Sequence, residues 1–143
     1  MPGQAWYQVC VPSANALPAA VGIALAERDS GRNRPVIAVI GDGSFQYSVQ
    51  SIWTAARLRL PMLIMVVQNN KYAILKSFAL LEQAPGVPGL DIPGLDIVSI
   101  ARGYGCDATR VADLDALKQA AAAAWTKQVP TVLEIPISPQ VPP

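Results

Sequence analysis

The stretch Val36-Ile-Ala-Val-Ile40, which runs directly into Gly41-Asp42-Gly43-Ser44, decides the fold of this 143-residue chain. An unbroken run of apolar, mostly β-branched residues is typical of a strand that is covered on both faces. A second apolar run, Met62–Val67, follows a segment with helical spacing from Ser48 to Leu60. Strand, helix and strand in this order predict two parallel strands joined by a right-handed crossover.

The same alternation continues on both sides of this unit. Further strands are expected at Tyr7–Val11, Cys106–Val111 (edge-like) and Thr131–Ile137. Further helices are expected from a cap at Ser13 or Asn15 to about Arg28, at Tyr72–Leu81, behind Asp96 to Arg102, and behind Asp113 to about Lys127. The pattern predicts one α/β domain with three layers, in which a mostly parallel sheet carries helices on both faces. The two most apolar strands should lie at its centre.

The segment from Glu82 to Leu95 shows neither the helical nor the strand spacing of apolar residues, and it contains three prolines. It includes the start of a tandem repeat, Pro88-Gly-Leu-Asp-Ile92 followed by Pro93-Gly-Leu-Asp-Ile97. Two copies do not make a repeat architecture. We interpret the segment as an ordered functional or contact loop.

The composition excludes several classes of protein. Apolar residues make up 52% of the chain and charged residues 15%, whereas typical soluble domains carry roughly 25% charged residues. This is not a disordered segment, and the shortage of charge indicates that part of the surface is covered by something else. A net charge of +1 without a basic cluster gives no basis for nucleic-acid binding. No apolar run approaches the roughly 20 residues of a membrane span, so no membrane association is expected.

The cysteine content, the absence of histidine and the N-terminal sequence exclude several kinds of site. Two cysteines, Cys10 and Cys106, are too few for a disulfide framework. The N-terminal sequence lacks the features of a signal peptide, and a cytoplasmic location is therefore expected. The chain has no histidine, which excludes Ser-His and Cys-His nucleophile pairs and His-ligated zinc.

Polar residues follow both apolar strands at the edge where parallel sheets bind ligands. If the strands are neighbours, Asp42 and Asn69 present two side-chain oxygens to one point. Together with a nearby backbone carbonyl they form a hard, all-oxygen set that suits Mg²⁺ or Ca²⁺ rather than zinc. The N–H groups of Gly43 and Ser44 could hold phosphate oxygens. The pattern predicts a metal-bridged diphosphate site.

Ordinary turn chemistry is the alternative interpretation, since Gly-Asp-Gly and Asn-Asn both occur in common turns. Their joint position after two apolar strands favours the binding site. A dinucleotide-binding fingerprint does not fit, because Gln46 stands where its third glycine belongs and no acid lies near position 62. The Gly-Lys-Ser/Thr of the nucleotide-hydrolase phosphate loop is also missing from the sequence.

Gly41-Asp42-Gly43, 25 intervening residues and then Asn69-Asn70 resemble the thiamine-diphosphate motif. The surroundings, including Trp53-Thr-Ala-Ala56, Tyr72-Ala-Ile-Leu75 and Val87–Asp96, resemble the C-terminal domain of benzoylformate decarboxylases and their acetolactate-synthase-like relatives. The resemblance extends from about Ala16 to Ser138.

The resemblance implies a metal site and a cofactor site. The metal, Mg²⁺ or Ca²⁺, would be held by the side chains of Asp42 and Asn69 and the backbone carbonyl of Lys71. If the register slips by one position, Asn70 replaces Asn69. The residues implied in binding thiamine diphosphate are Gly41, Asp42, Gly43, Ser44, Asn69, Lys71, Tyr72 and Ala73.

Ile74, Leu75 and Phe78 stand where the family lines its substrate pocket. Apolar side chains there would suit an aryl or branched 2-oxo acid, so the resemblance implies a carbon–carbon lyase that converts benzoylformate to benzaldehyde and CO₂. The alternative is the ordinary apolar face of a helix, which produces the same spacing.

Two features set this chain apart from a complete enzyme of the family. Ser13, within Val11–Asn15, stands where the family has a bulky apolar residue that supports the cofactor. The family also uses a glutamate from the N-terminal, pyrimidine-binding domain of a partner chain, and Glu27, Glu82 and Glu134 do not resemble it. We therefore expect a fragment of a longer enzyme that is inactive alone and works in a homo-oligomer, a dimer or tetramer.

Two other functions remain open at this stage. A carboligase of the acetolactate synthase type would share every motif described above. A non-catalytic α/β assembly module could retain the motif as a turn.

Overall fold

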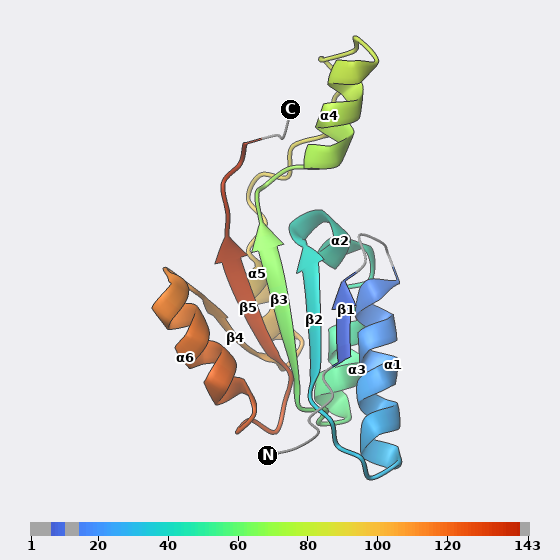
Figure 1. Ribbon diagram of the computed structural model, residues 1–143, viewed down its shortest axis with the longest axis vertical. Helices are drawn as coiled ribbons and strands as arrows, with labels where there is room; N and C mark the ends of the chain where they lie inside the picture. The colour runs from blue at the N-terminus through green and yellow to red at the C-terminus, as the bar shows by residue number, and fades with distance from the viewer. Residues whose placement is uncertain (1–6, 11–14, 141–143) are drawn as a thin grey trace.

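A computed structural model describes residues 7–10 and 15–140. The described residues form a five-stranded sheet with the order β1-β2-β3-β5-β4, and each pair of neighbouring strands is parallel (Figure 1). The strands are β1 Tyr7–Cys10, β2 Val36–Gly41, β3 Met62–Gln68, β4 Asp107–Arg110 and β5 Thr131–Pro136. The most apolar strands, β2 and β3, are neighbours, and β3 is the central strand, as the sequence predicted. β4 is an edge strand, also as predicted.

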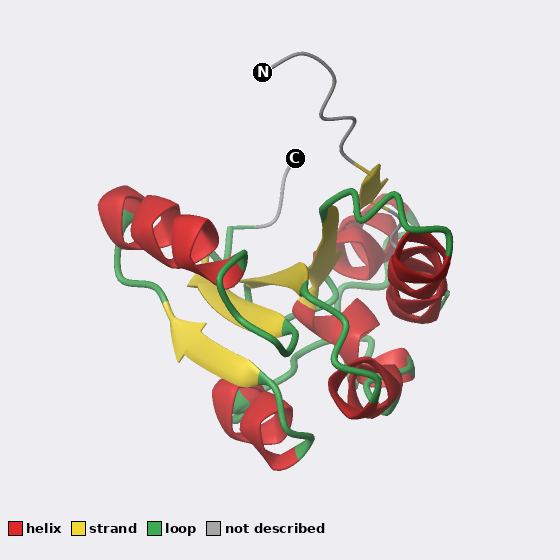
Figure 2. Cartoon of the chain, turned by 90° about the horizontal axis from the view of Figure 1, so that it is seen from below, coloured by secondary structure: helices red, strands yellow, loops and turns green. Residues whose placement is uncertain are grey.

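Helices cover both faces of the sheet, which confirms the three-layer α/β prediction (Figure 2). The helices are α1 Ala16–Asp29, α2 Asp42–Tyr47, α3 Ser51–Arg57, α4 Ala73–Leu81, α5 Ile97–Gly103 and α6 Leu114–Ala124. Residues of α1, α2, α3 and α5 contribute to one core cluster, whereas α6 packs on the opposite face. Helix α4 projects beyond the carboxyl ends of the strands (Figure 1).

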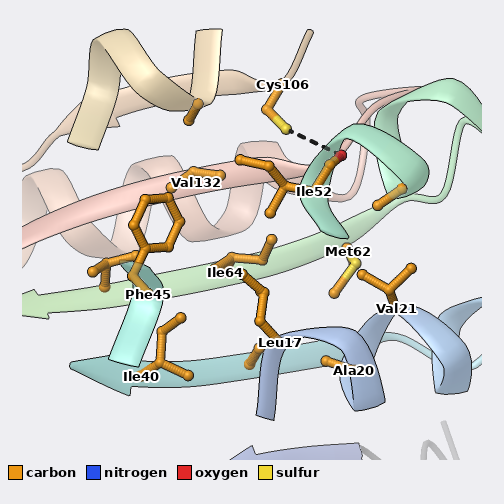
Figure 3. Close-up of a cluster of buried hydrophobic side chains, with 14 of the residues drawn as sticks. Leu17, Ala20, Val21, Ile40, Phe45, Ile52, Met62, Ile64, Cys106 and Val132 are labelled. Atoms are coloured by element: carbon orange, nitrogen blue, oxygen red, sulfur yellow. Dashed lines mark hydrogen bonds between the residues drawn. The ribbon is translucent and has the colours of Figure 1, made fainter. Parts of the chain in front are cut away.

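The larger core lies between the sheet and the four helices on its first face (Figure 3). Phe45 of α2 and Ile64 of β3 are fully buried there, together with Leu17 of α1. Burying one such side chain stabilises the fold by about 1.5–3 kcal/mol. Cys106 lies in the same cluster, where its Sγ is 3.8 Å from the carbonyl oxygen of Ile52, and burial raises the pKa of its thiol to about 12. This thiol is therefore a packing group.

Several helix ends differ from the sequence prediction. A separate short helix, α2, begins at Asp42 directly after β2, and the helix predicted for Ser48–Leu60 is confined to Ser51–Arg57. Asn15 is the N-cap of α1, but its side chain makes no capping hydrogen bond. The physical reason is that Asn15 has right-handed helical angles instead of the extended angles of a capping residue. The alternative cap, Ser13, lies outside the described residues.

The other two predicted caps are confirmed. The Asp96 carboxylate accepts a hydrogen bond from the N–H of Ser99, and the Asp113 carboxylate accepts one from the N–H of Ala116. Within the described part of the chain, no helix is both long and apolar enough to cross a bilayer.

Candidate cofactor and metal site

The loops that follow β2 and β3 leave the sheet side by side. Gly41, the last residue of β2, is in register with Val67, the next-to-last residue of β3. The condition on which the predicted site depended, that these two strands are neighbours, is therefore met. Asp42 begins α2 at this edge, and Asn69 begins the loop that leads to α4.

The Asp42 carboxylate joins the two loops through three backbone groups. Its Oδ1 accepts a hydrogen bond from the N–H of Gly43 at 2.9 Å. Its Oδ2 accepts bonds from the N–H groups of Asn69 at 3.1 Å and Asn70 at 2.7 Å. Since an ionised carboxylate has about four lone-pair sites, these three donors leave acceptor capacity over. Asp42 is 3% exposed, and no Lys or Arg of the described residues forms an ion pair with it.

The loop after β3 turns through its own side chains. The Asn69 side-chain oxygen accepts a hydrogen bond from the N–H of Lys71 at 3.1 Å, which is the bond of an Asx-turn. Asn70 has a positive φ of 59°, a conformation that asparagine tolerates better than most residues. Asn69 Oδ1 therefore lies on the same side of the loop as the Lys71 N–H and keeps a second lone pair.

Tyr72 packs against Gly43 from the second loop. A Cβ atom added to Gly43 would lie 2.3 Å from Cε1 of the Tyr72 ring, so only glycine leaves room for this ring. Burial raises the pKa of the Tyr72 phenol, and Tyr47 and Asp42 contribute in the same direction. The sequence reasoning did not identify Tyr47 as a neighbour of this site, because nothing in its spacing from Tyr72 indicates it.

The predicted pocket residues lie on the projecting helix α4. The exposed fractions are 63% for Ile74, 45% for Leu75 and 54% for Phe78. None of the nine described residues of α4 is buried. The three side chains therefore form an open apolar surface on this chain, and their role in a pocket stays a prediction.

The donor set fits a hard divalent cation. Among residues 7–10 and 15–140 no group of three or more Asp, Glu, Cys or His side chains gathers. A cation at this edge would therefore depend on one carboxylate, one amide oxygen and backbone carbonyls, which are ligands that Mg²⁺ and Ca²⁺ accept. The buried Asp42 charge, balanced by N–H groups and by no cationic side chain of the described residues, is consistent with that assignment.

None of the three glutamates belongs to this site. Glu27 is paired with Arg32 and Arg34, and the hydrogen bonds from Arg34, with a smaller contribution from Arg32, lower the pKa of Glu27 to about 2. Glu134 is paired with Arg110, and Glu82 follows α4 on the surface. That the chain itself supplies no glutamate for activating a cofactor stays a prediction.

Sequence comparison assigns the family. A family model described as "Thiamine pyrophosphate enzyme, C-terminal TPP binding domain" matches residues 2–135. The chain belongs to this family. Asp42, Asn69 and Lys71 are therefore residues of a thiamine pyrophosphate (TPP, or thiamine diphosphate) binding domain, and the fold described above is the fold of that domain.

Relatives of this TPP-binding domain include decarboxylases and synthases. It is 38% identical over 135 residues to a benzoylformate decarboxylase from Pseudomonas aeruginosa, covering 94% of this chain and 25% of the relative. It is 34% identical to a putative acetolactate synthase large subunit from Mycobacterium tuberculosis, covering 83% and 24%. The crystal structure of benzoylformate decarboxylase from Polynucleobacter necessarius superposes with a TM-score of 0.85 and 51% identity, covering 89% and 24%. The chain thus spans about a quarter of the length of these relatives.

Proposed function

We propose that this chain is the diphosphate- and metal-binding part of a thiamine-diphosphate-dependent decarboxylase that acts on aromatic 2-oxo acids such as benzoylformate. The observation that carries the proposal is the buried Asp42 carboxylate, which is hydrogen-bonded to Asn69 and Asn70 at the carboxyl ends of neighbouring strands. The domain family and the likeness to benzoylformate decarboxylases support the choice of cofactor and reaction.

The proposed binding residues divide between metal and diphosphate. Asp42, the Asn69 side chain and the Lys71 carbonyl hold Mg²⁺ or Ca²⁺. The diphosphate lies against the two loops, at Gly41, Gly43, Ser44, Tyr72 and Ala73. Thiamine diphosphate, when bound, supplies the electron sink for the electron pair left by the departing CO₂. The protein's own part is to hold the diphosphate end of the cofactor in place.

The remaining half of the active site is proposed to come from another domain. Glu27 and Glu134 are held in ion pairs, and Glu82 is exposed. As the resemblance to the family implies, a glutamate from the N-terminal pyrimidine-binding domain of a partner chain would complete the site in a cytoplasmic homo-oligomer. The exposed apolar residues of α4, Ile74, Leu75 and Phe78, line the 2-oxo acid pocket in that assembly.

The test uses the full-length protein that contains this domain. Calorimetry with thiamine diphosphate, with and without Mg²⁺, should give binding heat that depends on the metal, and benzoylformate should then yield benzaldehyde. Decarboxylation by residues 1–143 alone would contradict the half-site proposal. An absence of metal-dependent binding to the full-length protein would favour a non-catalytic assembly module.

A carboligase of the acetolactate synthase type is the second candidate, favoured by the 34% identity to the putative acetolactate synthase subunit. Product analysis separates the two functions. Acetolactate formed from pyruvate, without release of an aldehyde from benzoylformate, would identify the carboligase.

A further inference from the structure

The two copies of the tandem repeat share a glycine conformation and a buried last residue. Its two copies, Pro88–Ile92 and Pro93–Ile97, have the same five residues. The glycines Gly89 and Gly94 have positive φ angles of 78° and 73°, a conformation that glycine adopts without strain. Both copies end on a buried isoleucine, with exposed fractions of 8% for Ile92 and 0% for Ile97.

The two copies are attached to different parts of the molecule. In the second copy, the Asp96 carboxylate caps α5, and the Leu95 carbonyl accepts a hydrogen bond from the side chain of Gln68 at 3.1 Å. The first copy pairs instead with the loop that follows β3, as an antiparallel bridge between Lys71 and Asp91. We call this first copy, Pro88–Ile92, the strap. Figure 1 shows the segment after α4 running back beside the link between β3 and α4.

The hydrogen bonds of this bridge fix the orientation of Lys71. The N–H of Tyr72 donates to the Leu90 carbonyl at 2.9 Å, and the N–H of Ile92 donates to the Asn70 carbonyl at 2.8 Å. Lys71 and Asp91 are thus opposite each other without exchanging bonds themselves, which is the non-hydrogen-bonded pair of an antiparallel ladder. In such a pair, the N–H and C=O of each residue point away from the partner segment.

Lys71 follows this rule. Its N–H points away from the strap and donates to the Asn69 side-chain oxygen. Because the N–H and C=O of an extended residue point to the same side, the Lys71 carbonyl faces the side where Asn69 Oδ1 lies. The neighbouring Asn70 carbonyl points to the opposite side, toward the strap, where it accepts the N–H of Ile92.

We propose that the strap is a positioning element that aims the Lys71 carbonyl at the metal. This inference rests on the proposed function, because it presumes that a cation binds beside Asp42 and Asn69. Asp91 fastens the strap to α4 through an ion pair in which Lys76 Nζ is 2.6 Å from Asp91 Oδ1. The strap therefore ties the loop that follows β3 to the helix that carries Ile74, Leu75 and Phe78.

The repeat provides its own matched controls, because each substitution can be made in both copies. In the full-length protein, Ile92→Ala should weaken Mg²⁺ binding about tenfold at saturating thiamine diphosphate, since it loosens the buried end of the strap. Ile97→Ala should lower the melting temperature and leave the Mg²⁺ affinity unchanged. Asp91→Asn should weaken Mg²⁺ binding by about two- to fivefold, as expected for a partly exposed ion pair, whereas Asp96→Asn should not.

Two readouts separate positioning from general stability. The charge-swapped double variant Lys76→Asp/Asp91→Lys should recover most of the Mg²⁺ affinity that Asp91→Asn loses. Amide hydrogen exchange at Tyr72 and Ile92 should be slow in the unaltered protein and faster in Ile92→Ala, with protection in β3 retained.

The outcomes distinguish this inference from the proposed function. If the unaltered protein binds thiamine diphosphate with Mg²⁺, but Ile92→Ala and Asp91→Asn bind Mg²⁺ equally well, the positioning role is overturned and the proposed function stands. Fast exchange of both amides in the unaltered protein also overturns it. If the unaltered protein shows no Mg²⁺-dependent binding, both fail together.

Discussion

Two buried carboxylates, Asp42 and Glu27, lie near opposite ends of strand β2. Their negative charges are balanced in different ways. Each is 3% exposed. Glu27, at the edge where β2 begins, is neutralised by Arg32 and Arg34, whereas Asp42, where β2 ends, is held only by backbone N–H groups among the described residues. Buried charges in proteins are usually paired or coordinate metals. The comparison therefore assigns a structural role to Glu27 and supports the proposal that Asp42 binds a ligand.

The largest effect is expected for Asp42→Ala in the full-length protein. Losing the carboxylate removes the proposed metal ligand and the acceptor for three N–H groups, so Mg²⁺-dependent binding of thiamine diphosphate should weaken more than 100-fold. Calorimetry measures this loss. The control is Asp115→Asn on the exposed surface of α6, which should bind normally. Undiminished metal-dependent binding in Asp42→Ala would contradict the comparison.

Glu27→Gln should give the opposite result, with a lower melting temperature and an unchanged Mg²⁺ affinity. We expect a decrease of about 5 °C, because the substitution removes the buried carboxylate charge that pairs with Arg32 and Arg34. Thermal unfolding followed by circular dichroism measures it. A loss of cofactor affinity at a temperature where the variant is folded would show that Glu27 also serves the site.

The difference in melting temperature between the unaltered protein and Glu27→Gln should depend on pH, because folding lowers the pKa of Glu27 from 4.5 to about 2. A group whose pKa is lower in the folded state stabilises the fold above its unfolded pKa, and this contribution disappears as the pH falls through its folded pKa. The difference in melting temperature between the unaltered protein and Glu27→Gln should be constant above about pH 5 and shrink between pH 4.5 and pH 2. A difference that does not vary down to pH 2 would show that folding does not lower the pKa of Glu27, and would contradict this prediction.

Gly43→Ala tests how closely the two loops approach each other. The added Cβ would overlap the Tyr72 ring, at 2.3 Å from Cε1, so the variant should lose about 1–2 kcal/mol of stability and bind the cofactor more weakly. Tyr72→Ala should relieve part of the loss in the double variant, which a double-mutant cycle measures. The control is Gly22→Ala in α1, where the added Cβ meets no described atom within 4 Å apart from the neighbouring backbone of its own helix, and stability should rise slightly.

The smallest effect is expected at a third buried polar group, Thr131 at the start of β5. Its hydroxyl has no hydrogen-bond partner among the described residues, in contrast to the carboxylates of Asp42 and Glu27. Thr131→Val keeps the shape and removes the unpaired hydroxyl, so chemical denaturation should show a gain of about 1 kcal/mol. A loss of stability would show that the hydroxyl is satisfied, for example by a buried water molecule.

The sequence was sufficient to predict the sheet and the meeting of Asp42 with the Asn69 loop. Both depend on strong local patterns, the apolar strands β2 and β3, and on the general rule that parallel strands end at a common edge. The separate helix α2 was missed because Gly-Asp-Gly is typical of a turn, and its helical start at Asp42 depends on the contact with the β3 loop.

The pairing of the strap with the loop that follows β3 could not be predicted from the sequence. It joins Asn70–Tyr72 to Leu90–Ile92 through backbone groups. Such hydrogen bonds do not require particular side chains, so the sequence does not indicate them. The repeat of Pro-Gly-Leu-Asp-Ile predicts two similar turns and does not distinguish their attachments. The contact between Gly43 and Tyr72 was equally hidden, since it depends on the position of a ring across two loops.

The buried Cys106 provides a built-in reporter for these experiments. Its thiol is 6% exposed and, with a pKa of about 12, carries almost no thiolate at neutral pH, the form that alkylating reagents attack. In a Cys10→Ser background, labelling of Cys106 should therefore track the opening of the core around α3 and α5. The labelling rate would measure how often this core opens, with and without the cofactor.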